Sequence, residues 1–163
     1  MDILYKSFDA KGDLYRYILE QVEATWAETA DLTAALANTS AILMLLMPEL
    51  NWAGFYLMKG EGLVLGPFQG KPAVAHIEVG SGVCGTAVAE GKSQLVENVH
   101  QCCNHIACDL ATNSELVVPI FAGKATFGVI DLDSPVTGRF DEEDRRGIED
   151  LAAAIGRLVV NKA

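Results

Sequence analysis

Residues 114–134 read SELVVPIFAGKATFGVIDLDS, two apolar runs joined by Ala-Gly-Lys. Runs rich in β-branched residues on either side of a glycine-containing turn are typical of a β-hairpin. Asp131 and Asp133 alternate with Ile130 and Leu132, so strand geometry predicts both acids on one face of the sheet. Acids on a strand usually form a solvated face. Aspartate is a poor strand former, however, and two of them in the most apolar strand favour a functional role.

The register of this hairpin decides whether Glu115 joins the two acids. A three-residue turn over 122–124 brings Glu115 opposite Asp131, and the glycine in the turn favours this form. A two-residue turn brings Glu115 opposite Leu132, whose side chain points to the other face. Pro119 implies a bulge, which can shift the register once more.

Helical patterns lie at both ends of the chain and strand patterns lie between them. Apolar residues recur at helical spacing over residues 11–28. A second helix is predicted to begin after Asp31 as N-cap and to end before Pro48, and a last helix to open at Asp141. A short helix is expected over 82–91. The remaining strand patterns are WAGFYLM, GLVLGPF, VAHIEVG and SQLVENV.

These patterns predict an α+β fold, in which roughly six antiparallel strands are flanked by N-terminal and C-terminal helices. The chain has 163 residues and shows no repeat or linker, so we expect one domain over residues 1–163. The net charge is −10 without a basic run, which disfavours nucleic-acid binding. No signal peptide is visible, and the apolar run at 41–47 is shorter than the roughly 20 residues that cross a bilayer. We therefore expect a cytoplasmic protein without membrane contact.

All four cysteines fall within residues 81–120. Cytoplasmic thiols are kept reduced, so a cluster favours catalytic, redox or metal chemistry over structural disulfides. Cys84 lies at a glycine-led helix start, where backbone amides would lower the pKa of its thiol. The alternative is that it is a small buried apolar residue. Cys108 lies towards the end of an irregular segment, 99–113. Long loops in compact domains are commonly functional.

A metal site is the rival interpretation of this segment. Cys102, Cys103, His105 and Cys108 form the pattern C-C-x-H-x-x-C, whose atoms zinc accepts. Adjacent cysteines do not easily point at one tetrahedral centre, however, and paired C-x-x-C motifs are absent from the sequence. Zinc is therefore the weaker interpretation.

Several motifs in order resemble one known family over nearly the whole chain. They are NWAGFYL, GVCGTA, HIACD, NSELVVPI, GVIDLDS and GRFDEED. Together they are similar to the free methionine-(R)-sulfoxide reductases, which are stand-alone GAF-domain enzymes that reduce free methionine sulfoxide and not the peptide-bound form. The resemblance implies a GAF-like fold and a thiol-based oxidoreductase with no bound cofactor or metal.

In this family a cysteine thiolate attacks the sulfoxide sulfur, a sulfenic acid remains, and a second cysteine condenses with it to form a disulfide. Thioredoxin or another dithiol then reduces the disulfide. The motif match implies that Cys108 is the nucleophile. The residues matching the family's substrate-binding positions are the acids Glu115, Asp131 and Asp133 and the aromatics Trp52 and Tyr56.

The chemistry of free methionine explains the need for carboxylates. Its α-ammonium is absent from a peptide, so buried acids would stabilise the free amino acid and stay unpaired when a peptide is offered. Crowded like charges should also raise the pKa of at least one acid, which suits it to protonating the sulfoxide oxygen.

The chain departs from the family pattern at Val74, where members commonly carry a third cysteine. That thiol is a candidate resolving partner in many members, so its absence leaves the disulfide step open. Cys84 is the first substitute, Cys102 and Cys103 are alternatives, and direct reduction of Cys108 by an external thiol is a further possibility. The competing functions are a small-molecule-sensing GAF module, for which the chain offers no output segment, and a zinc-stabilised domain. GAF domains often pair through their terminal helices, so a homodimer is expected.

Overall fold

The computed structural model describes residues 7–101 and 110–162. Its helices are α1 (Lys11–Ala27), α2 (Leu32–Leu46), α3 (Gly82–Glu90) and α4 (Glu142–Lys162), with a short 3-10 helix, η1 (Val99–Gln101). Its strands are β1 (Trp52–Lys59), β2 (Gly62–Gly70), β3 (His76–Glu78), β4 (Gln94–Val96), β5 (Ser114–Ala122) and β6 (Ala125–Ser134). The predicted α+β class is confirmed.

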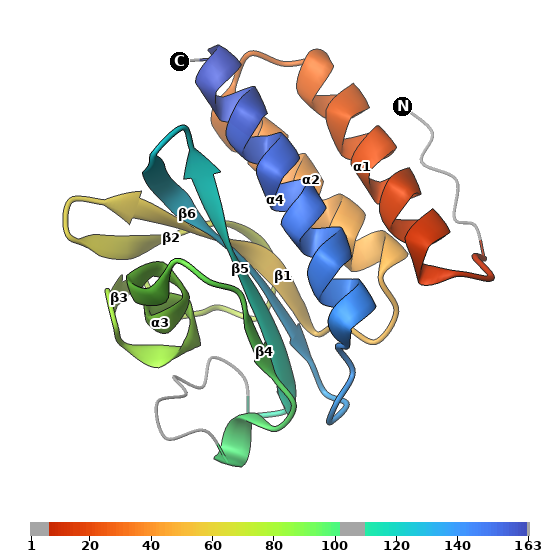
Figure 1. The fold of residues 1–163 in the computed structure, drawn as a ribbon, viewed down its shortest axis with the longest axis vertical. Helices are drawn as coiled ribbons and strands as arrows, with labels where there is room; N and C mark the ends of the chain where they lie inside the picture. Colours follow the sequence, from red (N-terminus) through yellow and green to blue (C-terminus); the bar gives the residue numbers. More distant parts are fainter. Residues whose placement is uncertain (1–6, 102–109, 163) are drawn as a thin grey trace.

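The six strands form one antiparallel sheet in the order β3-β2-β1-β6-β5-β4. Helices α1, α2 and α4 lie together on one side of the sheet, and α3 lies on the other (Figure 1). Strands β5 and β6 are therefore in contact with helices on both faces. A side chain on the α3 face of these strands is enclosed without belonging to the main core.

Alternation along the central strands divides the apolar residues between two cores. Ala53 and Phe55 of β1 face the helical layer with Leu116, Ile130 and Leu132, and this core is the larger one. The smaller core lies under α3. Its buried members are Trp52, Tyr56, Leu63, Ile77, Val83, Cys84, Ala87, Val117 and Val129.

Aspartates cap two helix starts, and the cap predicted at Asp31 is one of them. The Asp31 carboxylate accepts a hydrogen bond from the backbone N–H of Ala34 at 2.7 Å. The Asp141 carboxylate accepts bonds from the N–H groups of Glu143 (2.9 Å) and Asp144 (3.1 Å). Each cap satisfies donors that the first turn of a helix leaves unpaired. Among the described residues, no helix has both the length and the apolar character that crossing a membrane requires.

Candidate active site

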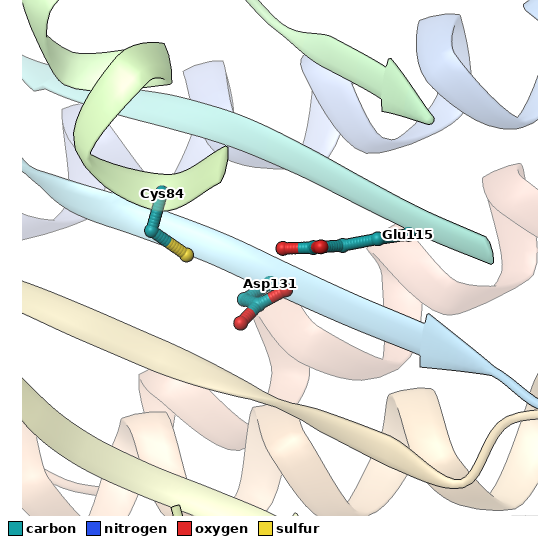
Figure 2. Close-up of side chains that lie close together, drawn as sticks. All are labelled: Cys84, Glu115 and Asp131. Carbon is teal, nitrogen blue, oxygen red and sulfur yellow. The ribbon is translucent and has the colours of Figure 1, made fainter. Parts of the chain in front are cut away.

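Three acids lie on the sheet face that α3 covers. Glu115 on β5 pairs with Asp133 on β6, and Asp133 pairs with Trp52 on β1. Asp131 is two residues earlier on β6 and therefore shares this face. Each acid is only 5% exposed. Figure 2 shows the carboxyls of Glu115 and Asp131 close to the sulfur of Cys84, which α3 contributes. The predicted placement of Asp131 and Asp133 on one face is confirmed, and Glu115, which the sequence pattern left open, lies on the same face.

The register arises from two local features, and each of them shifts the pairing of β5 with β6 by one residue. The turn has two residues, because Ala122 pairs with Ala125, and the expected three-residue turn is wrong. Gly123 supplies the positive φ of 66° that such a tight turn requires. On its own this turn would place Glu115 on the opposite face from the aspartates. A bulge at Phe127 adds one residue to β6 and returns Glu115 to their face.

Burial raises the pKa of Glu115 well above its ordinary value, and the charge of Asp133 raises it further. Burial is also the main cause of the raised pKa of Asp131, followed by the charge of Glu115. The two carboxyls lie within 4.8 Å of each other, and two buried carboxyls that share a site do not both ionise readily. The pair therefore holds a proton at a pH where exposed acids have lost theirs.

A buried acid elsewhere in the fold shows how this protein compensates a carboxylate when its role is structural. Asp144 accepts hydrogen bonds from Lys11 (2.7 Å), Arg139 (3.2 Å) and the hydroxyl of Tyr15 (2.5 Å). It thus has two cations in contact, as buried charges usually do. The causes of the raised pKa values of Glu115 and Asp131 are instead burial and neighbouring acids. The electrostatic environment of the sheet-face acids thus differs from that of Asp144.

Cys84 is buried at the first turn of α3, and its environment reverses the expected pKa shift. Burial is the largest cause of the raised pKa, and the charges of Asp131 and Glu115 add to it. The prediction that helix amides lower this pKa is therefore wrong, because the sheet opposite the helix contributes two carboxyls. The raised pKa favours the protonated thiol of Cys84, whose sulfur lies within 4.8 Å of a carboxylate oxygen of Asp131.

An aromatic wall borders the acids on β1 and β2. Trp52 stacks on Phe68 with ring centroids 5.2 Å apart and on Tyr56 at 6.1 Å. The indole N–H of Trp52 donates to the carbonyl of Lys71 (3.1 Å), and the Tyr56 hydroxyl donates to that of Val74 (2.9 Å). Both rings are thereby fixed. Phe68 was not among the predicted residues, and its only sequence signal is an aromatic residue within a strand pattern.

Small residues make room for the Trp52 ring. A side chain at Gly54 would meet the indole at 2.8 Å and the β-carbon of Phe68 at 2.4 Å. The WAG motif therefore combines the aromatic ring with the space that it needs.

Val74, at the position of the family's usual third cysteine, packs half-buried against the core that includes Cys84.

Three predicted site residues lie outside the described residues. They are Cys108, Cys102 and Cys103, and His105 of the alternative metal pattern lies there too. The structure brings together the other six predicted residues. They are Cys84, Glu115, Asp131, Asp133, Trp52 and Tyr56.

Replacing Asp131 by Asn is expected to stabilise the fold by about 0.5–2 kcal/mol near pH 8, because it removes a buried like charge. The pKa of Asp131 is raised above its unfolded value near 4. Its contribution to stability is thus fully present below about pH 4 and is lost as the pH rises through the folded pKa. The gain from Asn should therefore be larger at pH 8 than at pH 5. Urea unfolding at both values measures it.

Asp150→Asn is the matched control, since Asp150 is an exposed aspartate on α4. Its effect should stay within about 0.5 kcal/mol at either pH. A loss of stability in Asp131→Asn at pH 8 would show that the carboxylate is compensated in the fold, contrary to this account.

Comparison with known proteins connects this geometry to a family. A family model described as GAF domain matches residues 14–160. The chain is 46% identical to the free methionine-R-sulfoxide reductase of Escherichia coli over 149 residues, which cover 91% of this chain and 90% of the relative. It is 40% identical to the Saccharomyces cerevisiae protein of the same name, covering 97% and 92% of the two chains.

A solved structure extends the likeness to the whole fold. The free methionine-R-sulfoxide reductase of Neisseria meningitidis, determined in complex with its substrate, superposes with a TM-score of 0.90. The identity is 39%, and the match covers 99% of this chain and 95% of the other. Fold and sequence therefore agree over nearly the entire chain.

Proposed function

The chain belongs to the free methionine-R-sulfoxide reductases of the GAF-domain family, which are oxidoreductases, and from this premise we propose how it works. It reduces free L-methionine-(R)-sulfoxide to methionine through a cysteine sulfenic acid and a disulfide. The observation that carries this proposal is the group of buried acids beside a thiol and an aromatic wall. Such a group of side chains suits a small cation with a soft apolar end.

Glu115, Asp131 and Asp133 bind the α-ammonium of the substrate. Their burial makes an unmatched negative charge costly, so a cation that enters the pocket is strongly stabilised. A methionine sulfoxide within a peptide has an amide in place of the ammonium and leaves the acids unmatched. Selectivity for the free amino acid follows from that difference.

Trp52 and Tyr56 hold the methyl end of the side chain. A polarisable sulfur and its methyl group pack favourably against aromatic rings. Because each ring is fixed through its hydrogen bond to the 71–74 segment, little order has to be gained when the substrate binds. The wall and the acids together orient the sulfoxide.

The proton shared by Glu115 and Asp131 is delivered to the sulfoxide oxygen. An ammonium beside a carboxyl lowers the pKa of that carboxyl, so the arrival of the substrate makes the shared proton more acidic. Binding and proton donation are thus coupled in one pocket. A ligand without the ammonium neither binds well nor releases the proton.

Cys108 attacks the sulfoxide sulfur as a thiolate. The sulfur–oxygen bond breaks, and the oxygen ends on Cys108 as a sulfenic acid while methionine leaves. The step as a whole converts one thiol and one sulfoxide into one sulfenic acid and one thioether. The sulfoxide is reduced by two electrons and the cysteine is oxidised by two.

Cys84 resolves the sulfenic acid. Its thiol condenses with the Cys108 sulfenic acid to form a disulfide, and Asp131 relays the Cys84 proton to the departing hydroxyl, which leaves as one water. Cys102 and Cys103 are the alternative resolving thiols. Thioredoxin or another cytoplasmic dithiol then reduces the disulfide. The whole reaction takes place in one GAF domain, residues 1–163, which we expect to form a homodimer.

A single-turnover experiment tests this function. Reduced protein is mixed with free methionine-(R)-sulfoxide without reductant, and free thiols and methionine are counted. We expect one methionine and the loss of two thiols per chain. N-acetyl-methionine-(R)-sulfoxide, which lacks the ammonium, should give neither. Unchanged thiols with the free amino acid, or equal reaction with the acetylated form, would contradict the proposal.

A further inference from the structure

Cys84, Glu115 and Asp131 present three potential ligand atoms to one point. The sulfur of Cys84 and one carboxylate oxygen of each acid all lie within 4.8 Å of one another, and all three residues are buried. The three come from different elements, α3, β5 and β6, which the packing of the helix on the sheet holds together. Figure 2 shows the three side chains gathered in the space between α3 and the sheet.

One carboxylate oxygen of this cluster accepts no hydrogen bond from the described residues. Asp131 is 95% buried, and among the described residues its Oδ1 oxygen has no hydrogen-bond partner. Leaving a carboxylate oxygen buried and unmatched is costly, and a bound water or ion is one way in which native proteins satisfy such an atom. The cluster thus combines a convergent donor set with an orphaned acceptor inside it.

The donor types indicate which cation fits. A thiolate with two carboxylates suits zinc, whereas magnesium and calcium take six or more oxygens. Ligand atoms in a tetrahedral zinc site lie about 3.4–3.8 Å apart. The three ligand atoms, all within 4.8 Å of one another, are therefore close to this spacing. Three protein ligands leave a fourth position for water.

We propose that Cys84, Glu115 and Asp131 form an exchangeable site for a thiophilic divalent cation such as Zn²⁺. A bound cation takes Cys84 as a thiolate, so binding releases the thiol proton and no group is oxidised or reduced. The same carboxylates hold the substrate ammonium in the proposed function. A bound cation therefore excludes the amino acid, and this exclusion, unlike the binding itself, depends on that function.

Direct metal binding in a single-thiol protein tests the site. The substitutions Cys102→Ser, Cys103→Ser and Cys108→Ser leave Cys84 as the only thiol. Co²⁺ is the probe, because a cobalt–thiolate bond gives a near-ultraviolet charge-transfer band that carboxylates alone do not give. We expect this band with one Co²⁺ per chain, competition by Zn²⁺, and release of protons on binding. Circular dichroism confirms folding of each variant.

Further substitutions identify the ligands. Adding Cys84→Ser should abolish the band, and adding Asp131→Asn should weaken binding by about tenfold or more. Glu97→Gln removes an exposed acid of the same charge and should leave binding unchanged. Absence of the band, or a band that Asp131→Asn leaves unaltered, would overturn the proposal. If Co²⁺ binds but methionine does not displace it, the metal site stands and only the proposed function is contradicted.

Discussion

Replacing Glu115 by Gln is expected to lower kcat/KM for free methionine-(R)-sulfoxide by about 10²–10⁴-fold, the range for loss of a general acid. Glutamine has nearly the same size and still forms hydrogen bonds. It carries no negative charge for the ammonium and cannot hold the proton now shared with Asp131. The loss should divide between a higher KM and a lower kcat. Steady-state turnover with dithiothreitol as reductant measures both.

Glu97→Gln serves as the control for this substitution. Glu97 is exposed, and its replacement by Gln removes the same charge without touching the pocket. Its kinetic constants should match those of the unaltered protein. If Glu115→Gln also retained full kcat/KM, neither ammonium binding nor proton delivery could be assigned to the carboxyl pair.

Replacing Cys108 by Ser is expected to reduce methionine formation by about 10³-fold or more, because a serine hydroxyl is not an effective nucleophile toward the sulfoxide sulfur. Cys84→Ser separates the two thiol roles. In a single turnover without reductant it should still release one methionine per chain, since only the later disulfide step requires Cys84. The measurement is methionine released against time.

The opposite pattern would reverse the assignment of the thiols. A Cys84→Ser protein that releases no methionine, beside a Cys108→Ser protein that does, would make Cys84 the nucleophile. Such a result would also conflict with its burial and with the raised pKa of its thiol.

Local patterns predicted most of the architecture because local interactions determine it. The capping role of Asp31 follows from a side chain that bonds a backbone amide three residues away. The shared face of Asp131 and Asp133 follows from strand alternation alone. The motifs of the resemblance predicted the family over nearly the whole chain, and the comparisons confirm that family.

The register of β5 against β6 could not be predicted with the same security. The turn at Gly123 and the bulge at Phe127 each shift the pairing by one residue, and each shift moves Glu115 to the other face. Only their combination returns it to the aspartates. Pro119 indicated irregularity in the hairpin but not the residue where the bulge falls.

Tertiary neighbours also decided the electrostatics of Cys84. Its position at a helix start predicts a lowered pKa, since sequence shows the helix and not what lies opposite. In the fold the opposing groups are Asp131 and Glu115, and with burial they raise the pKa. The stacking of Phe68 on Trp52 likewise depends on the pairing of β1 with β2.

Calorimetric binding of free methionine-(R)-sulfoxide to the Cys108→Ser protein tests the recognition of the ammonium without turnover. We expect the free amino acid to bind and the N-acetylated form to bind at least about a hundredfold more weakly, because the buried acids then lack a cation. Equal affinities for the two ligands would contradict the assignment of Glu115, Asp131 and Asp133 as the ammonium site.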